Sequence, residues 1–272
     1  MAKINWLKIG ILILMTKFLK ALTIVEKVLE QQNIKVEPQL LWVYNPFYQG
    51  DERVMKHGNC SVQVFKDPEY APLSEIVVVN ANSRLEMFEN VAKNKNQIWI
   101  MELLESPVHT KNLNFFDGKI NYTASYHADS DLPIPYGFLV ENQNSSELAP
   151  IFPSEKPKKA VFVASNCWTS NSRSLLVDQL SRHYAIDRLG ACGNGRIPRK
   201  QLEKSLKTNY RYFLAFENSN CEDYITEKVF TAFKHDLIPI VYGAPKSSYE
   251  NLLPENSFIF VEDFQSVNDL AK

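Results

Sequence analysis

The hydrophobic pattern of the first half of the chain predicts buried strands. Apolar runs bounded by proline and polar residues occupy 40–45, 74–81 and 97–107, as in strands of a sheet covered on both faces. Residues 1–32 differ, because a short apolar stretch from Ile9 to Met15 lies between lysines. A bilayer span needs about 20 apolar residues. The segment therefore predicts either an amphipathic helix or a weak membrane anchor.

The second half alternates between strand and helix patterns. Strand-like runs occupy 160–166, 184–189, 212–218, 237–243 and 258–261. Helical patterns begin near Ser172, Gln201 and Thr226. This alternation is typical of an α/β fold with a parallel sheet, whose ligands bind in the loops after the carboxyl ends of the strands.

A proline-rich stretch separates the two halves and predicts a linker. The resulting division is an N-terminal segment at 1–32, an α/β domain at 33–145, a linker at 146–158 and a second α/β domain at 159–272.

Composition and charge narrow the function classes. The 272 residues are 45% hydrophobic, enough for two globular domains. With 30 Lys and Arg against 31 Asp and Glu, no overall basic field is available to hold nucleic acid. Glycine is scarce, with 9 residues, and the LGACGNG stretch has the wrong spacing for a glycine-rich phosphate loop, so it predicts an ordinary loop. Any bound anion must be held locally.

Cysteines and glycosylation sequons favour an oxidising compartment. Cys60, Cys167, Cys192 and Cys221 form no C-x-x-C pair, which argues against zinc and leaves two disulfides open. Sequons for N-glycosylation begin at Asn59, Asn121 and Asn144.

The segment 213–230 is the richest in candidate chemistry. It runs from an apolar strand through a polar loop into a helix, and brings several polar side chains to one strand end: Glu217, Asn218, Tyr224, Glu227 and Lys228. Thr226 is the expected N-cap. A lysine in the first helical turn opposes the helix dipole unless an anion lies in front of it. The alternative is that Lys228 bends back to Glu227 or Asp223.

Arg173 marks a second junction of the same kind, after the strand at 160–166. Arg173 and Lys228 on two junctions of one sheet would clamp a diphosphate, since a guanidinium makes paired hydrogen bonds to phosphate oxygens. The alternative is a solvated surface arginine.

The first half offers a candidate general base. Glu105 follows the apolar run 97–107 beside Pro107, where apolar neighbours would raise its pKa. Glu102 is the competitor, and a surface salt bridge is the alternative for either. Asp129 and Asp131 form a D-x-D pattern, but nearby prolines favour a structural turn over metal binding.

Together these motifs resemble the α1,3-fucosyltransferase family. The match is carried by LESPVHT, VASNCWTSNSR, the LGACGNG loop, FLAFENSNCEDYITEKVF and LIPIVYGAP, and it extends over residues 97–272. The SNC and GACGN sequences resemble those of invertebrate members more closely than those of vertebrate members. The resemblance implies a GT-B-like fold of two Rossmann-like domains with parallel sheets, the acceptor bound to the first domain and GDP-fucose to the second.

The resemblance also implies the reaction. Fucose would pass from GDP-β-L-fucose to the 3-hydroxyl of GlcNAc in glycoprotein glycans, with inversion and with Glu105 as base. Donor contacts fall on Arg173, Tyr224, Glu227 and Lys228, beside Glu217 and Asn218 on the same strand end. No metal is required for chemistry, although Mn²⁺ stimulates many members. Cys167 and Cys192 are candidates to pair.

Family members are typically type II Golgi membrane proteins anchored at the N-terminus, which is the expected localisation here. The chain also stops where relatives continue. Two alternatives therefore stay open: a truncated, catalytically impaired pseudoenzyme that binds GDP-sugar or glycan, and a GT-B transferase that uses another nucleotide.

Overall fold

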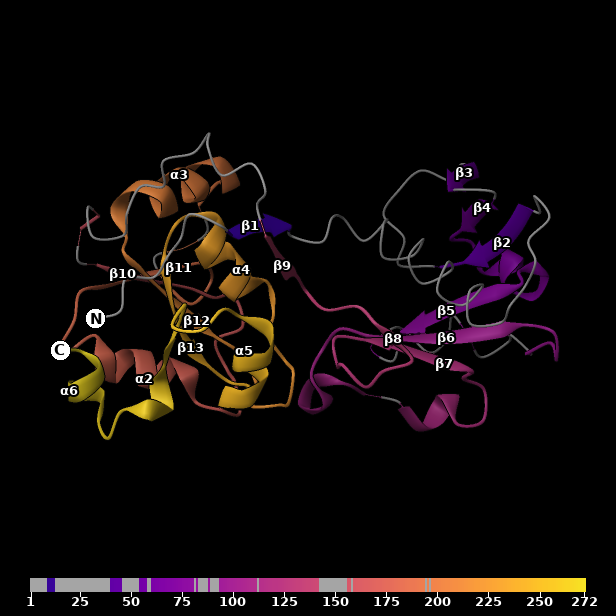
Figure 1. Ribbon diagram of the computed structural model, residues 1–272. Coiled ribbons are helices and arrows are strands. Elements are labelled where there is room, and N and C mark those ends of the chain that lie inside the picture. The colour runs from indigo at the N-terminus through magenta and orange to yellow at the C-terminus, as the bar shows by residue number, and fades with distance from the viewer. Residues whose placement is uncertain are drawn as a thin grey trace. The chain divides into compact units, whose positions relative to one another are not determined.

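The structure, a computed structural model, divides into two compact units. One comprises Leu14–Pro135, and the other comprises Met1–Ile13 with Tyr136–Lys272. The described residues are 9–12, 40–45, 54–57, 60–80, 82, 88, 93–111, 113–141, 156–157, 159–193, 195 and 197–272. Each unit contains a largely parallel β-sheet; the described α-helices all lie in the unit that ends at Lys272, and the described helices of the Leu14–Pro135 unit are short 3-10 helices, with elements labelled as in Figure 1.

The Leu14–Pro135 unit contains a seven-stranded sheet. Its strands are β2 (Leu40–Tyr44), β3 (Val54–His57), β4 (Cys60–Phe65), β5 (Ile76–Asn80), β6 (Ile98–Leu103), β7 (Tyr122–Ser125) and β8 (Leu132–Pro133). They lie in the order β3-β4-β2-β5-β6-β7-β8. Every pairing is parallel except the edge strand β3, which runs antiparallel to β4.

The three predicted strands of this unit are β2, β5 and β6. They are recognisable because both faces are covered: in β5, residues Ile76 to Val79 are all buried, so the strand reads as a continuous apolar run. On one face of β5, Val77 and Val79 share a hydrophobic core with Trp99, Phe88 and Phe116. Strands β3, β4, β7 and β8 were not predicted, because they lack such runs.

The other unit contains a five-stranded, fully parallel sheet. Its strands are β10 (Ala160–Val163), β11 (Ile186–Leu189), β12 (Tyr212–Phe216), β13 (Ile238–Tyr242) and β14 (Ile259–Phe260), in the order β11-β10-β12-β13-β14. Its helices are α2 (Arg173–Leu180), α3 (Arg199–Asn209), α4 (Glu227–Lys234), α5 (Lys246–Leu252) and α6 (Val267–Leu270). All five strands and the helices α2, α3 and α4 match the predicted pattern.

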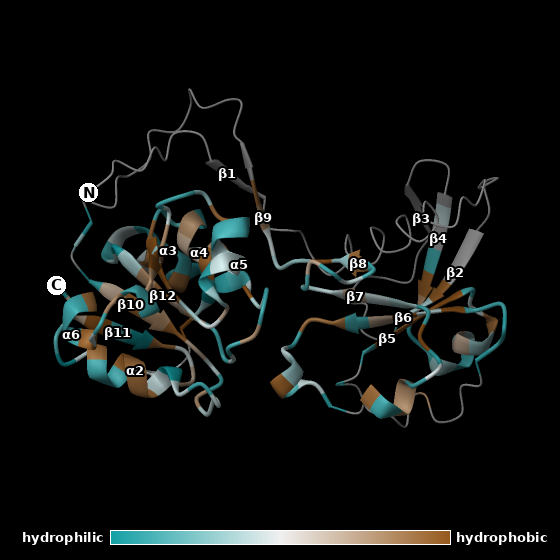
Figure 2. Ribbon diagram, turned by 60° about the horizontal axis from the view of Figure 1, so that its bottom comes forward, coloured by the Kyte–Doolittle hydropathy of each residue, from teal (hydrophilic) through white to brown (hydrophobic). Residues whose placement is uncertain are grey.

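Helices cover both faces of this sheet, as Figures 1 and 2 show. Successive strand residues point to opposite faces. Val161 and Phe213 therefore share a core with α3, α4 and α5, whereas Phe162 and Leu214 share one with α2 and α6. Because helices cover both faces, a ligand can reach this sheet only at the loops that follow the strand ends.

The N-terminal segment differs from its prediction where it is described. Ile9–Leu12 forms β1, an antiparallel partner of β9 (Phe138–Glu141), so a helix is wrong for these four residues. The rest of 1–32 lies outside the described residues. No helix in the described part of the chain is long and apolar enough to cross a membrane.

Most of the predicted linker, 146–155 and 158, also lies outside the described residues. Lys156, near its end, is buried and donates hydrogen bonds to the carbonyls of His235 and Asp236, at 2.5 and 2.9 Å. Burial lowers the pKa of Lys156. These two carbonyls follow the end of α4, so Lys156 packs against the end of that helix within the same unit.

Candidate functional site

Two adjacent strand-to-helix junctions bring the predicted cations to one edge of the five-stranded sheet. Strand β10 leads through a polar loop to α2, which begins at Arg173, and β12 leads to α4, whose second residue is Lys228. Because β10 and β12 are parallel neighbours, both loops leave from the same carboxyl edge. The predicted juxtaposition of the two junctions is therefore present.

Arg173 is not a solvated surface residue. Its side chain is buried, and its guanidinium nitrogens donate to the carbonyls of Phe216 at 2.7 Å and Asn166 at 2.9 Å. Burial lowers the pKa of Arg173, against the opposing effect of the nearby carboxylates. Its Nε is buried and has no hydrogen-bond partner among the described residues. Arg173 thus joins the loop after β10 to the end of β12.

Glu217, Thr226 and Lys228 form a buried hydrogen-bonded cluster at the start of α4. The Glu217 carboxylate is 1% exposed and accepts from the backbone N–H and the hydroxyl of Thr226, both at 2.9 Å. Lys228 Nζ lies 2.9 Å from Glu217 Oε2 and 2.6 Å from Thr226 Oγ1. Thr226 is the N-cap residue, as predicted, but its hydroxyl serves this cluster and makes no capping bond to the helix.

Lys228 lies between two carboxylates. Lys228 Nζ also lies 3.5 Å from Glu227 Oε1. Burial alone would lower the pKa of Lys228, but the carboxylates of Glu217 and Glu227 together raise it. The alternative in which Lys228 turns back to a carboxylate is thus what the structure shows, with Glu217 as a partner in addition to Glu227.

The remaining predicted donor residues differ in accessibility. Glu227 is exposed in the first turn of α4, and Asn218 is partly exposed. Tyr224 is buried and meets Tyr136 edge-on, with ring centroids 6.4 Å apart. In this structure the Tyr224 ring is therefore part of the packed interior beneath the loop.

Two residues that support the cluster were missed from the sequence. Asn171 donates to the Glu217 carbonyl at 2.9 Å and to Asn220 Oδ1 at 2.8 Å, so it ties the two loops together. Gly243 has φ +142°, and a Cβ there would lie 2.7 Å from Glu217 Cβ. A glycine directly after an apolar strand signals such a close approach, but only the fold identifies Glu217 as the neighbour.

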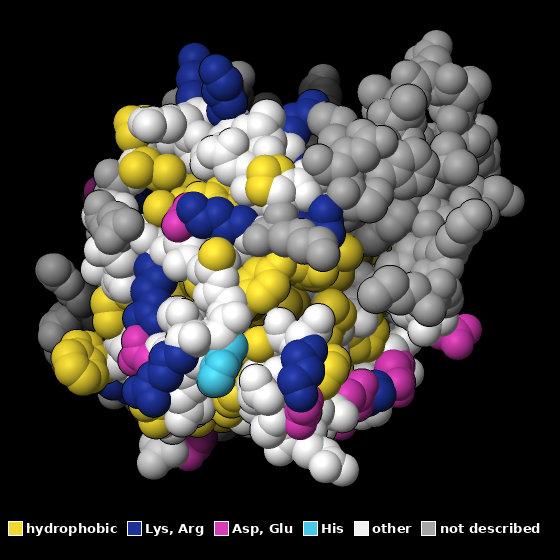
Figure 3. Space-filling model, turned by 90° about the vertical axis from the view of Figure 1, so that its left-hand side faces the viewer, with side chains coloured by type: hydrophobic (Ala, Val, Ile, Leu, Met, Phe, Trp, Pro, Cys, Tyr) yellow, Lys and Arg dark blue, Asp and Glu magenta, His cyan; other side chains and the backbone are white. Residues whose placement is uncertain are grey.

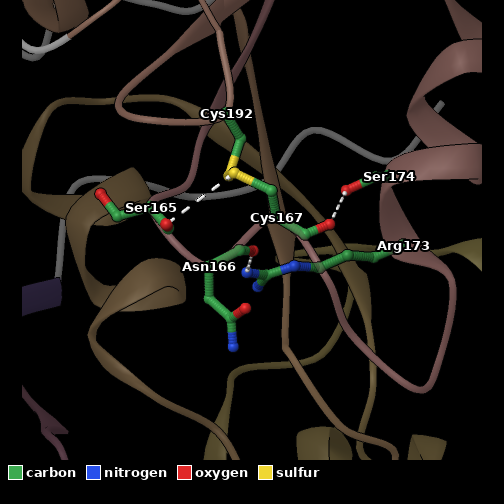
Figure 4. The surroundings of a disulfide bond; sticks show 6 residues. All are labelled: Ser165, Asn166, Cys167, Arg173, Ser174 and Cys192. Atoms are coloured by element: carbon green, nitrogen blue, oxygen red, sulfur yellow. Dashed lines mark hydrogen bonds between the residues drawn. A yellow bond between two sulfur atoms is a disulfide. The ribbon is translucent and has the colours of Figure 1, made fainter.

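A disulfide holds the β10–α2 loop to the loop after β11. Cys167 and Cys192 are bonded, and Ser174 Oγ donates to the Cys167 carbonyl at 3.2 Å, as Figure 4 shows. The Asn166 carbonyl that accepts from Arg173 belongs to the residue before Cys167. The predicted LGACGNG loop is a loop, and a Cβ at Gly190 would collide with the Ala164 carbonyl. Cys221 is a free thiol.

Glu105 lies in the other unit, in a bend after β6. Its side chain is exposed, so the expected apolar enclosure of this carboxylate is wrong. The backbone beside it is well held, because Ser106 is buried and its carbonyl accepts from His109 N at 2.9 Å and Thr110 Oγ1 at 2.8 Å. The turn presents Glu105 at the carboxyl end of its strand, as predicted. Glu102, the competitor, lies within β6 and is partly exposed.

Asp131 has a structural role in the seven-stranded sheet. Its Oδ2 accepts from the backbone N–H and the hydroxyl of Thr123 at 2.8 and 2.7 Å, and the N–H bond is the main cause that lowers the pKa of Asp131. The carboxylate thus joins β7 to the residue before β8. Among the described residues no group of three or more His, Cys, Asp or Glu side chains is placed to hold a metal ion.

One of the three predicted glycosylation sites is described. Asn121 Oδ1 accepts from Trp99 N at 2.9 Å and Lys93 Nζ at 2.7 Å. Asn59 and Asn144 lie outside the described residues.

Surface charge is dispersed on the face that Figure 3 shows. Basic side chains lie beside acidic ones and are not gathered into one field. Two ion pairs of the same unit are Lys246 with Asp263 at 2.7 Å and Arg188 with Asp178 at 2.5 Å.

Two family models match the chain. The model described as "Glycosyltransferase family 10 (fucosyltransferase) C-term" matches residues 153–272, and "Fucosyltransferase, N-terminal" matches residues 25–137. The first contains the Arg173 and Lys228 junctions, and the second contains Glu105.

Characterised relatives are similar over part of their length. The chain is 37% identical over 186 residues to glycoprotein 3-alpha-L-fucosyltransferase A of Drosophila melanogaster, covering 66% of this chain and 37% of the relative. It is 33% identical over 225 residues to 4-galactosyl-N-acetylglucosaminide 3-alpha-L-fucosyltransferase FUT6 of Homo sapiens, covering 80% of this chain and 62% of the relative. The chain thus spans less than two thirds of either relative.

Solved structures share the fold. A crystal structure of an α1,3-fucosyltransferase aligns with a TM-score of 0.60 at 18% identity, over 86% of this chain and 77% of the other. A crystal structure of α1,3-fucosyltransferase with GDP-fucose aligns with a TM-score of 0.56 at 19% identity, over 86% and 76%. The two α/β units are accordingly those of a GT-B-like fold.

Proposed function

Because the chain belongs to glycosyltransferase family 10, the fucosyltransferases, we propose that it transfers L-fucose from GDP-β-L-fucose to the 3-hydroxyl of GlcNAc in glycoprotein glycans. The observation that carries the proposal is the placement of Arg173 and Lys228 at neighbouring strand ends beside the first turn of α4. The crystal structure of an α1,3-fucosyltransferase with GDP-fucose, which shares the fold, supports the choice of donor.

In the proposed donor site the diphosphate approaches the first turn of α4. Lys228 exchanges its long contact with the exposed Glu227, 3.5 Å, for a phosphate oxygen while it keeps Glu217 at 2.9 Å. The free N–H groups of the helix start and the helix dipole add to this attraction. Arg173 adds a second cation at the neighbouring β10–α2 junction, and the further donor contacts Asn218, Tyr224 and Glu227 lie at the β12–α4 junction. No metal is needed to hold the diphosphate in this arrangement, and Mn²⁺ would act as a stimulator only.

The proposed reaction is a single displacement with inversion. The acceptor oxygen forms a bond to the anomeric carbon of fucose while the bond from that carbon to the phosphate oxygen breaks, and GDP leaves. Glu105 takes the proton of the acceptor hydroxyl. Its exposure at the end of β6 leaves it accessible to a glycan. Cations on the leaving group and a carboxylate at the acceptor are what a transition state with oxocarbenium character requires.

A direct assay of fucose transfer tests this proposal. The purified chain is incubated with GDP-fucose and a core N-glycan glycopeptide, and the product is followed by mass spectrometry, with the anomeric configuration read by NMR. We expect a fucosylated product with an α linkage. Folded protein that gives no product with any GlcNAc-containing acceptor would overturn the proposal.

Two matched variants test the base. Glu105→Gln removes the proposed proton acceptor, and Glu102→Gln changes the competing carboxylate within β6. We expect Glu105→Gln to lower kcat by a factor of about 100 or more and to leave GDP affinity unchanged, whereas Glu102→Gln keeps most activity. The reverse result would move the base to Glu102.

A further inference from the structure

The loop from β10 to α2 has two different sides. Along residues 166–173 the exposed positions are 166, 168, 170 and 172, and the partly or fully buried positions are 167, 169, 171 and 173. The inward side is anchored by the Cys167 disulfide, by Asn171 bound to the Glu217 carbonyl and by Arg173 bound to the Phe216 carbonyl. These contacts fix the direction in which the outward side chains point.

The outward side carries a fully exposed indole. Trp168 is 92% exposed, more than any other large hydrophobic residue in the described part of the chain. Its neighbours on this side are one amide and two hydroxyls: Asn166, Ser170 and Ser172. The residues on either side of Trp168 are held by the disulfide and the hydrogen bonds of Asn171 and Arg173, and the exposed indole has apolar faces that a ligand would remove from water.

The absence of charged residues in this segment indicates which chemical class of ligand it would bind. Residues 160–172 contain no Asp, Glu, Lys or Arg, in contrast to the charged Glu217 cluster on the neighbouring loop. A neutral sugar ring suits such a surface. One face of a pyranose is a row of C–H groups that packs on an aromatic ring, and its hydroxyls pair with amide and hydroxyl side chains.

We propose that the outward side of this loop is a subsite for the acceptor glycan, in which Trp168 stacks on a sugar ring beyond the GlcNAc that receives fucose. The inference rests on the proposed function, because the acceptor oxygen must reach the donor's anomeric carbon and so must approach the carboxyl edge from which this loop leaves. Trp168 then determines affinity for the glycan and takes no part in the chemical step.

The experiment compares Trp168→Ala and Trp168→Phe with Leu175→Ala, a control that removes an apolar side chain 56% exposed on α2 of the same unit. The glycan probe is a core N-glycan glycopeptide, compared with GlcNAc alone. Truncation of a Trp at the centre of a contact typically costs about tenfold in affinity. We expect Trp168→Ala to raise the KM for the glycopeptide by about tenfold, with kcat and the KM for GDP-fucose unchanged. Trp168→Phe retains most affinity, and Leu175→Ala has no effect.

A binding readout separates this proposal from the proposed function. Saturation-transfer NMR detects the glycopeptide on the protein whether or not fucose is transferred. Loss of that signal in Trp168→Ala, with an unchanged melting temperature, supports the subsite even if the wild-type chain shows no transfer. An unchanged glycopeptide signal in Trp168→Ala, or a loss of GDP affinity in its place, would overturn it.

Discussion

The ammonium of Lys228 and the carboxylate of Glu217 are 2.9 Å apart and are bridged by the hydroxyl of Thr226. The side chains are 17% and 1% exposed. The cation proposed to hold a donor phosphate is thus held in place before any donor arrives. This pre-organisation has a consequence for stability, because each member of the pair compensates the burial of the other.

Lys228→Met should destabilise the protein by about 3–5 kcal/mol, because it leaves the Glu217 carboxylate buried without its cation. Urea unfolding measures the change. The double variant Glu217→Gln with Lys228→Met removes both charges and keeps an acceptor for the Thr226 N–H, so it should recover most of the loss. Equal stability of the single and double variants would show that the pair is not coupled in this way.

Gly243→Ala should lower the free energy of unfolding by about 2–4 kcal/mol. The added Cβ would meet Glu217 Cβ at 2.7 Å, at φ +142°, and would displace the carboxylate from Thr226. Gly195→Ala is the matched control in the same unit, since its φ is +95° and a Cβ there meets nothing within 4 Å. The control should cost about 1 kcal/mol from backbone strain alone. Similar losses in both variants would place the cost of Gly243→Ala in the backbone and not in contact with Glu217.

The positions of the site residues were predictable, but their contacts were not. Apolar runs bounded by polar residues locate β10, β12 and α4 in the sequence, and so place Arg173 and Lys228 at strand ends. Arg173 nevertheless donates to a carbonyl 43 residues away. A local pattern carries no information on such a contact, because it depends on which strands become neighbours in the sheet.

The elements missed from the sequence share a physical reason. Strands β3, β4 and β7 and helix α5 mix polar with apolar residues and contain no continuous apolar run, so tertiary pairing and not local pattern decides their structure. The predicted enclosure of Glu105 failed similarly, since apolar sequence neighbours did not bury it. Trp168 illustrates the converse, because its hydrophobicity gives no hint of its 92% exposure.

Asp131 predicts a pH dependence of stability. Its carboxylate has a pKa lowered from 3.8 by the hydrogen bonds from Thr123. A group with a depressed folded pKa stabilises the protein above its unfolded pKa, and this stabilisation is lost as the pH falls through the folded value. Asp131→Asn should therefore be less stable than wild type by about 1 kcal/mol at pH 7, and the difference should shrink as the pH falls below about 4. The free energy of unfolding, measured at pH 7 and below about pH 4, checks this, and Asp129→Asn is the control. A difference independent of pH would assign the loss to packing.

The Cys167–Cys192 disulfide should stabilise the unit that contains Tyr136–Lys272. It should also hold in place the loop that contributes to both the proposed donor site and the proposed glycan subsite. The cysteines are 25 residues apart, and closing such a loop is worth about 3.5 kcal/mol in the chain-entropy description. Cys167→Ser should lower the free energy of unfolding by about this amount, whereas Cys221→Ser, which removes the free thiol, should not. Because the Asn166 and Cys167 carbonyls hold Arg173 and Ser174, the Cys167 variant should also bind GDP and the glycopeptide more weakly, as measured by calorimetry. A Cys167→Ser protein with wild-type stability and affinities would show that the hydrogen bonds of the loop fix it without the disulfide.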